Sequence, residues 1–180
     1  NATTTFFGTY QFDNLPSGHD WRITPSRTST DLCGIDAEDI AIIGDYLLGD
    51  YSEITSAYAR LATDADESGT MNTLDLIEIQ KFILGFSTGF TTNWRFVDAD
   101  FTFPPPSSIS GVNYAYPSTI SHENLTQNAL EDDFVAVKIG DINCSYDNSC
   151  DESDESCGFD CRTDIIPSVA LCPAEFTGDQ

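Results

Sequence analysis

The stretch from Asp64 to Asp75 carries oxygen-bearing side chains at a spacing that suits a hard divalent cation. Calcium takes about six to eight oxygen ligands, and its loops turn sharply at a central glycine, here Gly69. The candidate ligands at loop positions 1, 3, 5, 7, 9 and 12 are Asp64, Asp66, Ser68, Thr70 (through its carbonyl), Asn72 and Asp75. An acidic surface turn that caps a helix is the competing interpretation, because the same residue types dominate turns. The complete pattern favours Ca²⁺ as a cofactor, although Ser68 and the short Asp75 lower the expected affinity.

The loop belongs to an internal repeat, because residues 35–49 and 71–85 align without gaps and superpose Asp39 on Asp75. A repeated loop-plus-helix unit predicts two helices that pack on each other through equivalent faces. Each helix would end at a glycine, as helices often do. Asp36 and Asp39 are expected to cap the first helix. The apolar residues at helical spacing in the second helix are Leu76, Ile79, Ile83 and Phe86.

Several motifs in a fixed order resemble one family. The duplicated loop and helix, with Asp at position 12 and a helix ending Y-L-L-G or F-I-L-G, is similar to a type I dockerin, in the variant found in large secreted bacterial surface proteins. The flanking segments that resemble this variant are Gly8–Gly18, Asn93–Val97 and Phe134–Asn143. Motifs in the right order are more specific than any one alone. The resemblance covers roughly residues 8–143.

The resemblance implies an α+β fold. In it, a pair of dockerin-like calcium-loop helices packs with the β strands of a partial Ig- or prealbumin-like sandwich. The segment from Tyr10 to Thr24 resembles the final hairpin of a prealbumin-like or collagen-adhesin-B-like sandwich whose earlier strands are missing.

The first repeat departs from the calcium pattern, because the positions before Asp39 that would supply ligands hold poor ones such as Leu32. Two interpretations follow. In one, this half has lost its metal and its two aspartates simply cap a helix. In the other, a distant segment supplies the oxygens, with Asp141 and Asn143 standing at positions 1 and 3. Asp31 is a further candidate ligand.

Charge excludes two classes of partner. Thirty acidic residues against seven basic ones give a net charge of −23, which would be repelled by nucleic acid and by anionic membranes. No apolar run approaches the ~20 residues that span a bilayer, so no membrane insertion is expected. Bound divalent cations would relieve the self-repulsion of such a chain. Asn1 follows no basic-plus-apolar leader, which predicts a mature form or an excised piece.

An even number of cysteines predicts an oxidising compartment, and hence a secreted, cell-surface protein. The six are Cys33, Cys144, Cys150, Cys157, Cys161 and Cys172. Their pairing cannot be read from the sequence, although Cys33 is expected to tie the first repeat to the tail. Zinc is disfavoured, because no C-x2-C pair recurs and the two histidines are not at ligand spacing. Possible glycan acceptors are the N-x-S/T triplets at Asn1, Asn124 and Asn143.

Patterning divides the chain into four regions. Residues 1–27 are expected to form the β hairpin segment of a sandwich, 28–90 the helix pair, 91–143 a β extension, and 144–180 a cysteine-rich acidic loop with a C-terminal strand. Within these, the predicted strands are 93–103, 134–139 and a last one at 165–171, and 107–133 is predicted to be loop.

The sequence predicts a non-catalytic protein, because it has no matched nucleophile–base motif. We expect a structural or adhesive subunit or repeat of an extracellular bacterial fibre or surface protein, stabilised by calcium and disulfides. Copies would join head to tail, as a homopolymer or as tandem-repeat neighbours, through β-strand pairing. The alternative for the tail is that it folds back on its own hairpin. The alternative function is a dockerin module that anchors an enzyme to a cohesin scaffold.

Overall fold

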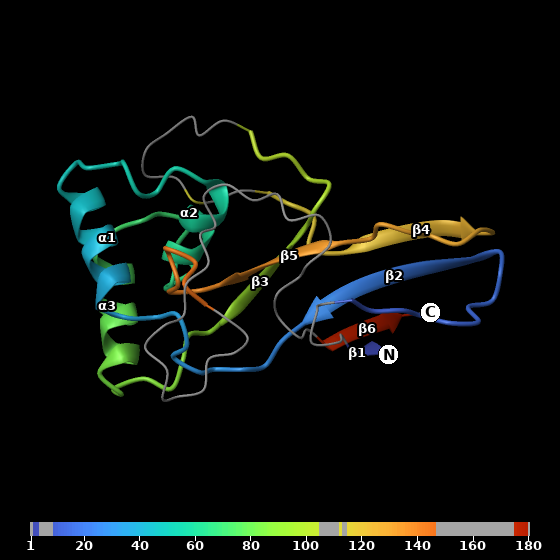
Figure 1. Cartoon of the computed structure of the whole chain (residues 1–180), viewed down its shortest axis with the longest axis horizontal. Coiled ribbons are helices and arrows are strands. Elements are labelled where there is room, and N and C mark those ends of the chain that lie inside the picture. Colours follow the sequence, from blue (N-terminus) through green and yellow to red (C-terminus); the bar gives the residue numbers. More distant parts are fainter. Residues whose placement is uncertain (1, 4–8, 105–111, 113–114, 147–174, 180) are drawn as a thin grey trace.

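Helices gather at one end of the molecule and the larger β-sheet at the other, with a two-stranded sheet between them (Figure 1). The computed structural model describes residues 2–3, 9–104, 112, 115–146 and 175–179. The elements in chain order are β1 (Ala2–Thr3), β2 (His19–Ser26), α1 (Ala37–Leu47), α2 (Ala57–Thr63), α3 (Thr73–Ile83), β3 (Trp94–Asp98), β4 (Ile120–Leu125), β5 (Phe134–Lys138) and β6 (Glu175–Asp179). The predicted α+β class is confirmed.

The predicted pair of helices is confirmed as α1 and α3, each of 11 residues. Both begin with a capping box, in which Asp36 and Asp39 cap α1 as expected and Asn72 and Asp75 cap α3. Ile43 and Ile79, which are equivalent in the repeat, are both fully buried in the main core. The two helices therefore contact each other through equivalent faces.

Both helices end at the repeated glycine. Gly49 and Gly85 have φ of 102° and 72°, a left-handed conformation that glycine adopts at little cost. Phe86 was expected on the apolar face of α3, and this is wrong: the helix ends at Ile83, and Phe86 is 80% exposed beyond the glycine. The left-handed residue turns the chain away from the helix axis, so the helical spacing no longer applies.

A third helix, α2, was not predicted. Ser56 caps it by accepting a hydrogen bond from the Ala59 N–H at 2.9 Å. Leu61 and Ala62 bury its apolar side against Val97 and Val137 of the two-stranded sheet. Ser56 ahead of an alanine-rich stretch is the local signal for this helix. Its short length gives only two turns of periodicity, which is too little to stand out.

The two-stranded sheet pairs β3 with β5 in antiparallel register, Trp94 opposite Lys138 and Asp98 opposite Phe134. Both strands were predicted, although β3 is shorter than the expected 93–103. Trp94 and Phe96 lie on one face, with Phe134 in the same cluster. Alternate residues of both strands pack on α2 from the other face. The expected alternation of strand side chains is therefore confirmed.

The larger sheet has the strand order β1-β6-β2-β4. The predicted hairpin from Tyr10 to Thr24 is wrong, because residues 9–18 form no strand and β2 pairs instead with β4 and β6. Tyr10 and Phe12 bury their rings against the cluster around Trp94 instead of pairing their backbones. The Tyr10 hydroxyl donates a hydrogen bond to the Asp132 carbonyl.

The two remaining predictions about strands concern the loop expected at 107–133 and the strand expected at 165–171. The prediction that 107–133 is loop is wrong at β4, which pairs with β2 from Ile23 opposite Ile120 to His19 opposite Leu125. The last strand predicted at 165–171 lies outside the described residues. A strand does form at β6, and it pairs with β2 of the same chain. In the described part of the chain, no helix combines the length and apolar character needed to cross a membrane.

Candidate metal centres

The first candidate centre is the contiguous loop of residues 64–75, which joins α2 to α3. One carboxylate oxygen from each of Asp64, Asp66 and Asp75 lies within 4.8 Å of the others. Asp75 organises this arrangement from the start of α3. Its Oδ1 accepts hydrogen bonds from the N–H groups of Ala65 (3.0 Å) and Asp66 (3.3 Å), and its Oδ2 accepts from that of Asn72 (2.9 Å). The predicted ligands at positions 1, 3 and 12 are thus brought together.

The remaining predicted ligands of the contiguous loop lie side by side. The Ser68 hydroxyl lies 3.1 Å from the Thr70 carbonyl oxygen, and the Asn72 side-chain amide donates to that same carbonyl at 3.3 Å. Glu67 and Gly69 adopt left-handed φ values of 59° and 73°, which curl the loop around its oxygens. Carboxylate, hydroxyl and carbonyl oxygens are the ligand types that calcium prefers.

The carboxylates of the contiguous loop are largely removed from water. Asp75 is fully buried and Asp64 is nearly so. Burial raises the pKa of Asp75 to about 6, since removing a carboxylate from water disfavours its charged form. A divalent ion would offset both the desolvation and the mutual repulsion of the three carboxylates.

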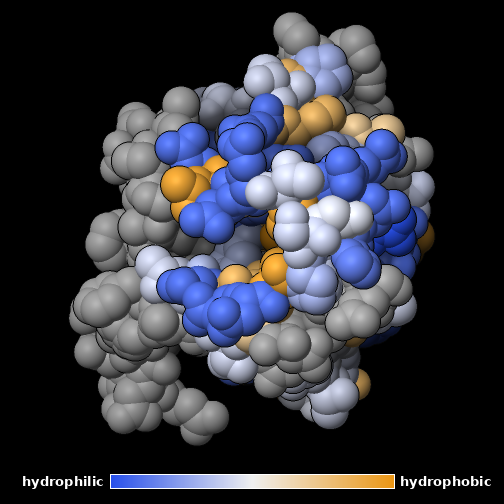
Figure 2. Space-filling view, turned by 90° about the vertical axis from the view of Figure 1, so that its right-hand side faces the viewer, coloured by the Kyte–Doolittle hydropathy of each residue, from blue (hydrophilic) through white to orange (hydrophobic). Residues whose placement is uncertain are grey.

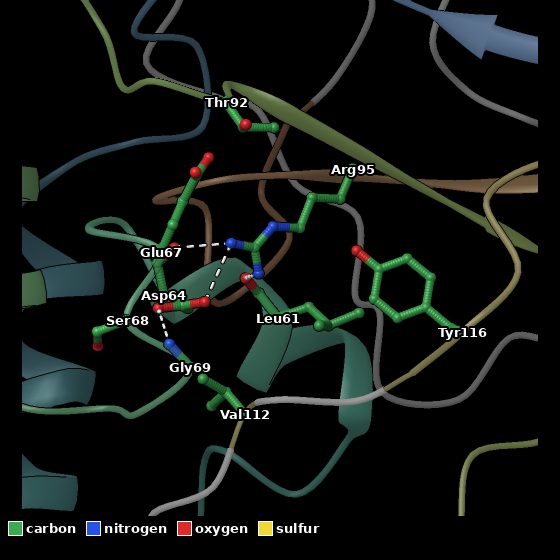
Figure 3. Close-up of a pocket in the computed structure, with 9 residues that line it drawn as sticks. All are labelled: Leu61, Asp64, Glu67, Ser68, Gly69, Thr92, Arg95, Val112 and Tyr116. Carbon is green, nitrogen blue, oxygen red and sulfur yellow. Dashed lines mark hydrogen bonds and ion pairs between the residues drawn. The ribbon is translucent and has the colours of Figure 1, made fainter.

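Arg95 of β3 contacts the outer side of the contiguous loop (Figure 3). Its guanidinium donates to Asp64 Oδ2 at 3.0 Å and to the carbonyl oxygens of Asp64 (3.1 Å) and Leu61 (3.3 Å). This leaves Asp64 Oδ1, which accepts from the Gly69 N–H at 3.2 Å, on the loop side. A polar cavity of about 390 Å³, with Arg95 and Tyr116 in its wall, adjoins the loop here. Arg95 therefore ties the two-stranded sheet to the candidate centre.

A second loop of the same design is assembled from two distant segments, 141–146 and 34–39, which we call the split loop. Asp39 Oδ1 accepts from the N–H groups of Ile142 (2.7 Å) and Asn143 (3.3 Å), and its Oδ2 accepts from that of Asp36 (2.9 Å). These bonds reproduce those of Asp75. Asp141, Ile142 and Asn143 thus take the places of residues 64–66, as one interpretation of the sequence predicted.

The correspondence continues along the split loop. Asp141 accepts from the Ser145 and Tyr146 N–H groups (2.8 and 3.1 Å), and Asn143 accepts from that of Ser145 (3.0 Å). The Ser145 hydroxyl lies 3.1 Å from the Gly34 carbonyl oxygen, the distance that separates Ser68 from Thr70. Cys144, at position 4, has a φ of 58° against 59° for its counterpart Glu67.

Three potential ligands of the split loop were missed from the sequence: Ser145 at position 5, the Gly34 carbonyl at position 7 and Asp36 at position 9. Ser145 could have been found from the sequence, because Asp141, Asn143 and Ser145 have the same spacing as Asp64, Asp66 and Ser68. The structure also explains why the positions before residue 34 hold poor ligands. Tyr146 occupies position 6, and the loop continues on another segment at Gly34.

The split loop buries its carboxylates as deeply as the contiguous one. Burial, together with the neighbouring charge of Asp39, raises the pKa of Asp141 to about 7. Burial raises the pKa of Asp39 to about 6. One part of each interpretation of the first repeat agrees with the structure. Asp36 and Asp39 cap α1, as the first interpretation predicted, and the distant segment contacts Asp39, as the second predicted. Whether this loop holds a metal stays a prediction.

Asp31 was expected as a further ligand, and the structure gives it a different partner. Its Oδ1 accepts from the Lys138 ammonium at 2.5 Å and from the Cys33 N–H at 3.2 Å. Burial acts to raise the pKa of Asp31, but the hydrogen bonds from Lys138 and Ser29 outweigh it and lower that pKa. Lys138 itself is buried beside the rings of Trp94 and Tyr146. Asp31 is thus the counterion of a buried lysine.

The cysteines are only partly described. Cys33 and Cys144, which adjoin the two halves of the split loop, are disulfide-bonded. Cys150, Cys157, Cys161 and Cys172 lie outside the described residues. The expected link between Cys33 and the tail stays a prediction.

The close approach of the two halves gives a test by substitution. Gly34 and Gly49 both have positive φ, but only at Gly34 would an added Cβ lie 2.6 Å from the backbone nitrogen of Tyr146. Gly49→Ala is expected to cost about 1–2 kcal/mol for the left-handed conformation. Gly34→Ala should cost about 1–3 kcal/mol more, because the two segments must separate. Urea unfolding of both variants measures the difference. Equal losses would show that the segments are not packed at this point.

Proton binding gives a second test. In metal-free protein, Asp39, Asp75 and Asp141 have pKa values above the ordinary 3.8, so the folded state holds protons more tightly than the unfolded chain. Their contribution to stability is lost as pH rises through about 6–7, so metal-free protein should melt higher at about pH 5 than at about pH 8. With saturating calcium this order should reverse, because protons compete with the ion. Thermal melts of metal-depleted and calcium-loaded protein at both pH values measure it, and Asp75→Asn should weaken both trends. The same trend in both forms would contradict the expectation.

The chain matches no protein-family model, no curated protein and no solved structure. The resemblance to dockerins therefore stays a prediction from the motifs.

Proposed function

We propose that the chain is a non-catalytic structural or adhesive subunit, or one repeat, of an extracellular bacterial fibre or surface protein, stabilised by calcium and disulfides. One observation carries the proposal: two acidic loops with matching hydrogen bonds precede α1 and α3, and each buries carboxylates that a cation would neutralise. Disulfide bonding at Cys33 and Cys144 supports an oxidising compartment. The net charge of −23 would be partly offset by bound divalent ions.

The experiment combines calcium titration with electron microscopy. Isothermal titration of the metal-depleted chain should show calcium uptake at two sites, one for each loop. Electron micrographs of the purified protein should show filaments that are lost or loosened when a chelator is added. A chain that takes up no calcium would remove the basis of the proposal.

Assembly by strand pairing is part of this proposal. The strand β6 lies between β1 and β2 and pairs with both of them. The larger sheet therefore depends on a strand that is distant in sequence from β2. A terminal strand can pair in the same register with β2 of the next copy, which would join copies head to tail and complete an Ig- or prealbumin-like sandwich. Closure within one chain is the competing outcome. A monodisperse monomer in size-exclusion chromatography at high concentration would favour closure.

A second candidate function is a dockerin module that binds a cohesin. The specific observation in its favour is that α3 exposes apolar side chains, with Leu74 at 55% and Ile77 at 41%. The resemblance places the recognition residues at loop positions 10 and 11, which include Leu74. A pull-down with a cohesin, compared with a Leu74→Asp variant, separates this function from the structural one.

A further inference from the structure

We infer that Asn124 is an acceptor for an N-linked glycan and that Asn143 is not. Both belong to N-x-S/T triplets, Asn124-Leu125-Thr126 and Asn143-Cys144-Ser145. Such triplets are common by chance, so the sequence alone does not separate them. The structure does, through the surroundings of each side chain. The inference rests on the secreted location in the proposed function and is independent of calcium.

Asn124 lies at the end of β4, at the tip of the larger sheet and away from the helices (Figure 1). Asn124 and Thr126 are both exposed. Within the described part of the chain, no hydrogen bond holds the Asn124 side-chain amide, whereas its backbone N–H donates to Asp20 Oδ1 at 2.8 Å. Its φ of 51° coincides with a break in the register between β4 and β2, where His19 pairs with Leu125 and Trp21 with His122. A bulky polar group can therefore be attached without displacing a packed residue.

The surface around this end of the molecule suits a glycan. Figure 2 views the molecule from this side, and hydrophilic side chains cover much of the described surface there, with small apolar areas between them. β4 is also the outer strand in the order β1-β6-β2-β4. An outer strand is a liability for edge-to-edge pairing, and a glycan at its end would obstruct such pairing. It would leave the opposite edge of the sheet, formed by β1, unobstructed.

Asn143 is unsuited for the same modification. Its Oδ1 accepts from the Ser145 N–H at 3.0 Å, and its own N–H donates to the buried Asp39. The residue is half-buried inside the split loop, next to the disulfide-bonded Cys144. A glycan on this amide would disturb the hydrogen bond between Asn143 and Ser145 that closes the split loop.

The chemistry is transfer of an oligosaccharide from a lipid pyrophosphate donor, the usual class of co-substrate for this reaction. The Asn124 Nδ2 forms a bond to the anomeric carbon of the sugar and loses one proton to a base of the transferase. The bond from that carbon to the pyrophosphate oxygen breaks, and the lipid pyrophosphate leaves with the electron pair. No oxidant or reductant is required.

The test uses the full chain exported by a bacterium that carries an oligosaccharyltransferase for asparagine, followed by reduction, digestion with trypsin and mass spectrometry of the peptides. Cleavage after Arg95 and Lys138 separates Asn124, in the peptide 96–138, from Asn143, in the peptide 139–162. We expect the glycan on 96–138 only. It should be lost in Asn124→Gln and in Thr126→Ala, which leaves Asn124 itself in place, and it should persist in Asn143→Gln.

An unmodified peptide 96–138, or a glycan on 139–162, would overturn the inference. Calcium titration of the same preparations separates this failure from that of the proposed function. Calcium uptake without a glycan would reject only the Asn124 assignment. A glycan on Asn124 without calcium uptake would reject only the calcium-stabilised module.

Discussion

Removal of calcium is expected to lower the melting temperature of this chain by about 10–20 °C. A site held at about 100 times its dissociation constant stabilises the folded state by about 2.7 kcal/mol, and there are two candidate loops. For a chain of this size, each 1 kcal/mol corresponds to a shift of about 2–4 °C. The physical reason lies in the buried carboxylates of Asp39, Asp75 and Asp141, whose pKa values burial raises and whose charged forms a divalent ion would stabilise.

Differential scanning calorimetry with and without EGTA at neutral pH measures this shift. Asp64→Ala combined with Asp75→Ala should remove about half of the calcium-dependent part, because the split loop remains. Glu123→Gln is the matched control, since it also removes an acidic charge but lies on the exposed side of β4, outside both loops. If EGTA left the melting temperature unchanged in wild-type protein, calcium would have no structural role here.

Apart from the split loop, which one interpretation of the sequence predicted from its repeat, the features predicted correctly have local hydrogen bonds or local periodicity. The capping boxes of α1 and α3 join residues three apart, and the contiguous loop closes within twelve positions, so residue types at fixed spacing suffice to predict them. The strands β3 and β5 were also predictable, because one face of each is apolar and alternates.

The prediction of a hairpin failed because of contacts between distant segments, whereas the misplaced Phe86 and the unpredicted α2 are local errors. Alternation of Tyr10 and Phe12 is compatible with a strand, but pairing depends on which edge is available, and β2 takes β4, about a hundred residues away, as its partner. Asp31 was a reasonable ligand by type. It became the counterion of Lys138, 107 residues distant, because a buried ammonium requires one. Burial of this kind depends on the whole fold and leaves no local pattern.

Substitutions in the split loop test whether each of the two loops binds its own calcium ion. Asp141→Asn and Asp75→Asn each replace one carboxylate by a group of nearly the same shape, in the split and the contiguous loop respectively. Each variant should lose one of the two calcium ions found by isothermal titration, and the double variant should lose both. Asn keeps only one of the two oxygens that accept loop hydrogen bonds. A calcium-free melting temperature close to that of wild type would show that the lost ion reports charge and not unfolding.

Amide hydrogen exchange locates the effect in the chain. The N–H groups of Ile142, Asn143, Ser145 and Tyr146 donate to the side chains of Asp39, Asp141 and Asn143. Calcium at the split loop should slow the exchange of these amides in wild type and in Asp75→Asn, but not in Asp141→Asn. Because Ile142 and Asp39 are 103 positions apart, protection there requires that the two segments form one site. If Asp141→Asn retained both ions and the full protection, the segments would form only a hydrogen-bonded turn, and the chain would hold its second ion elsewhere.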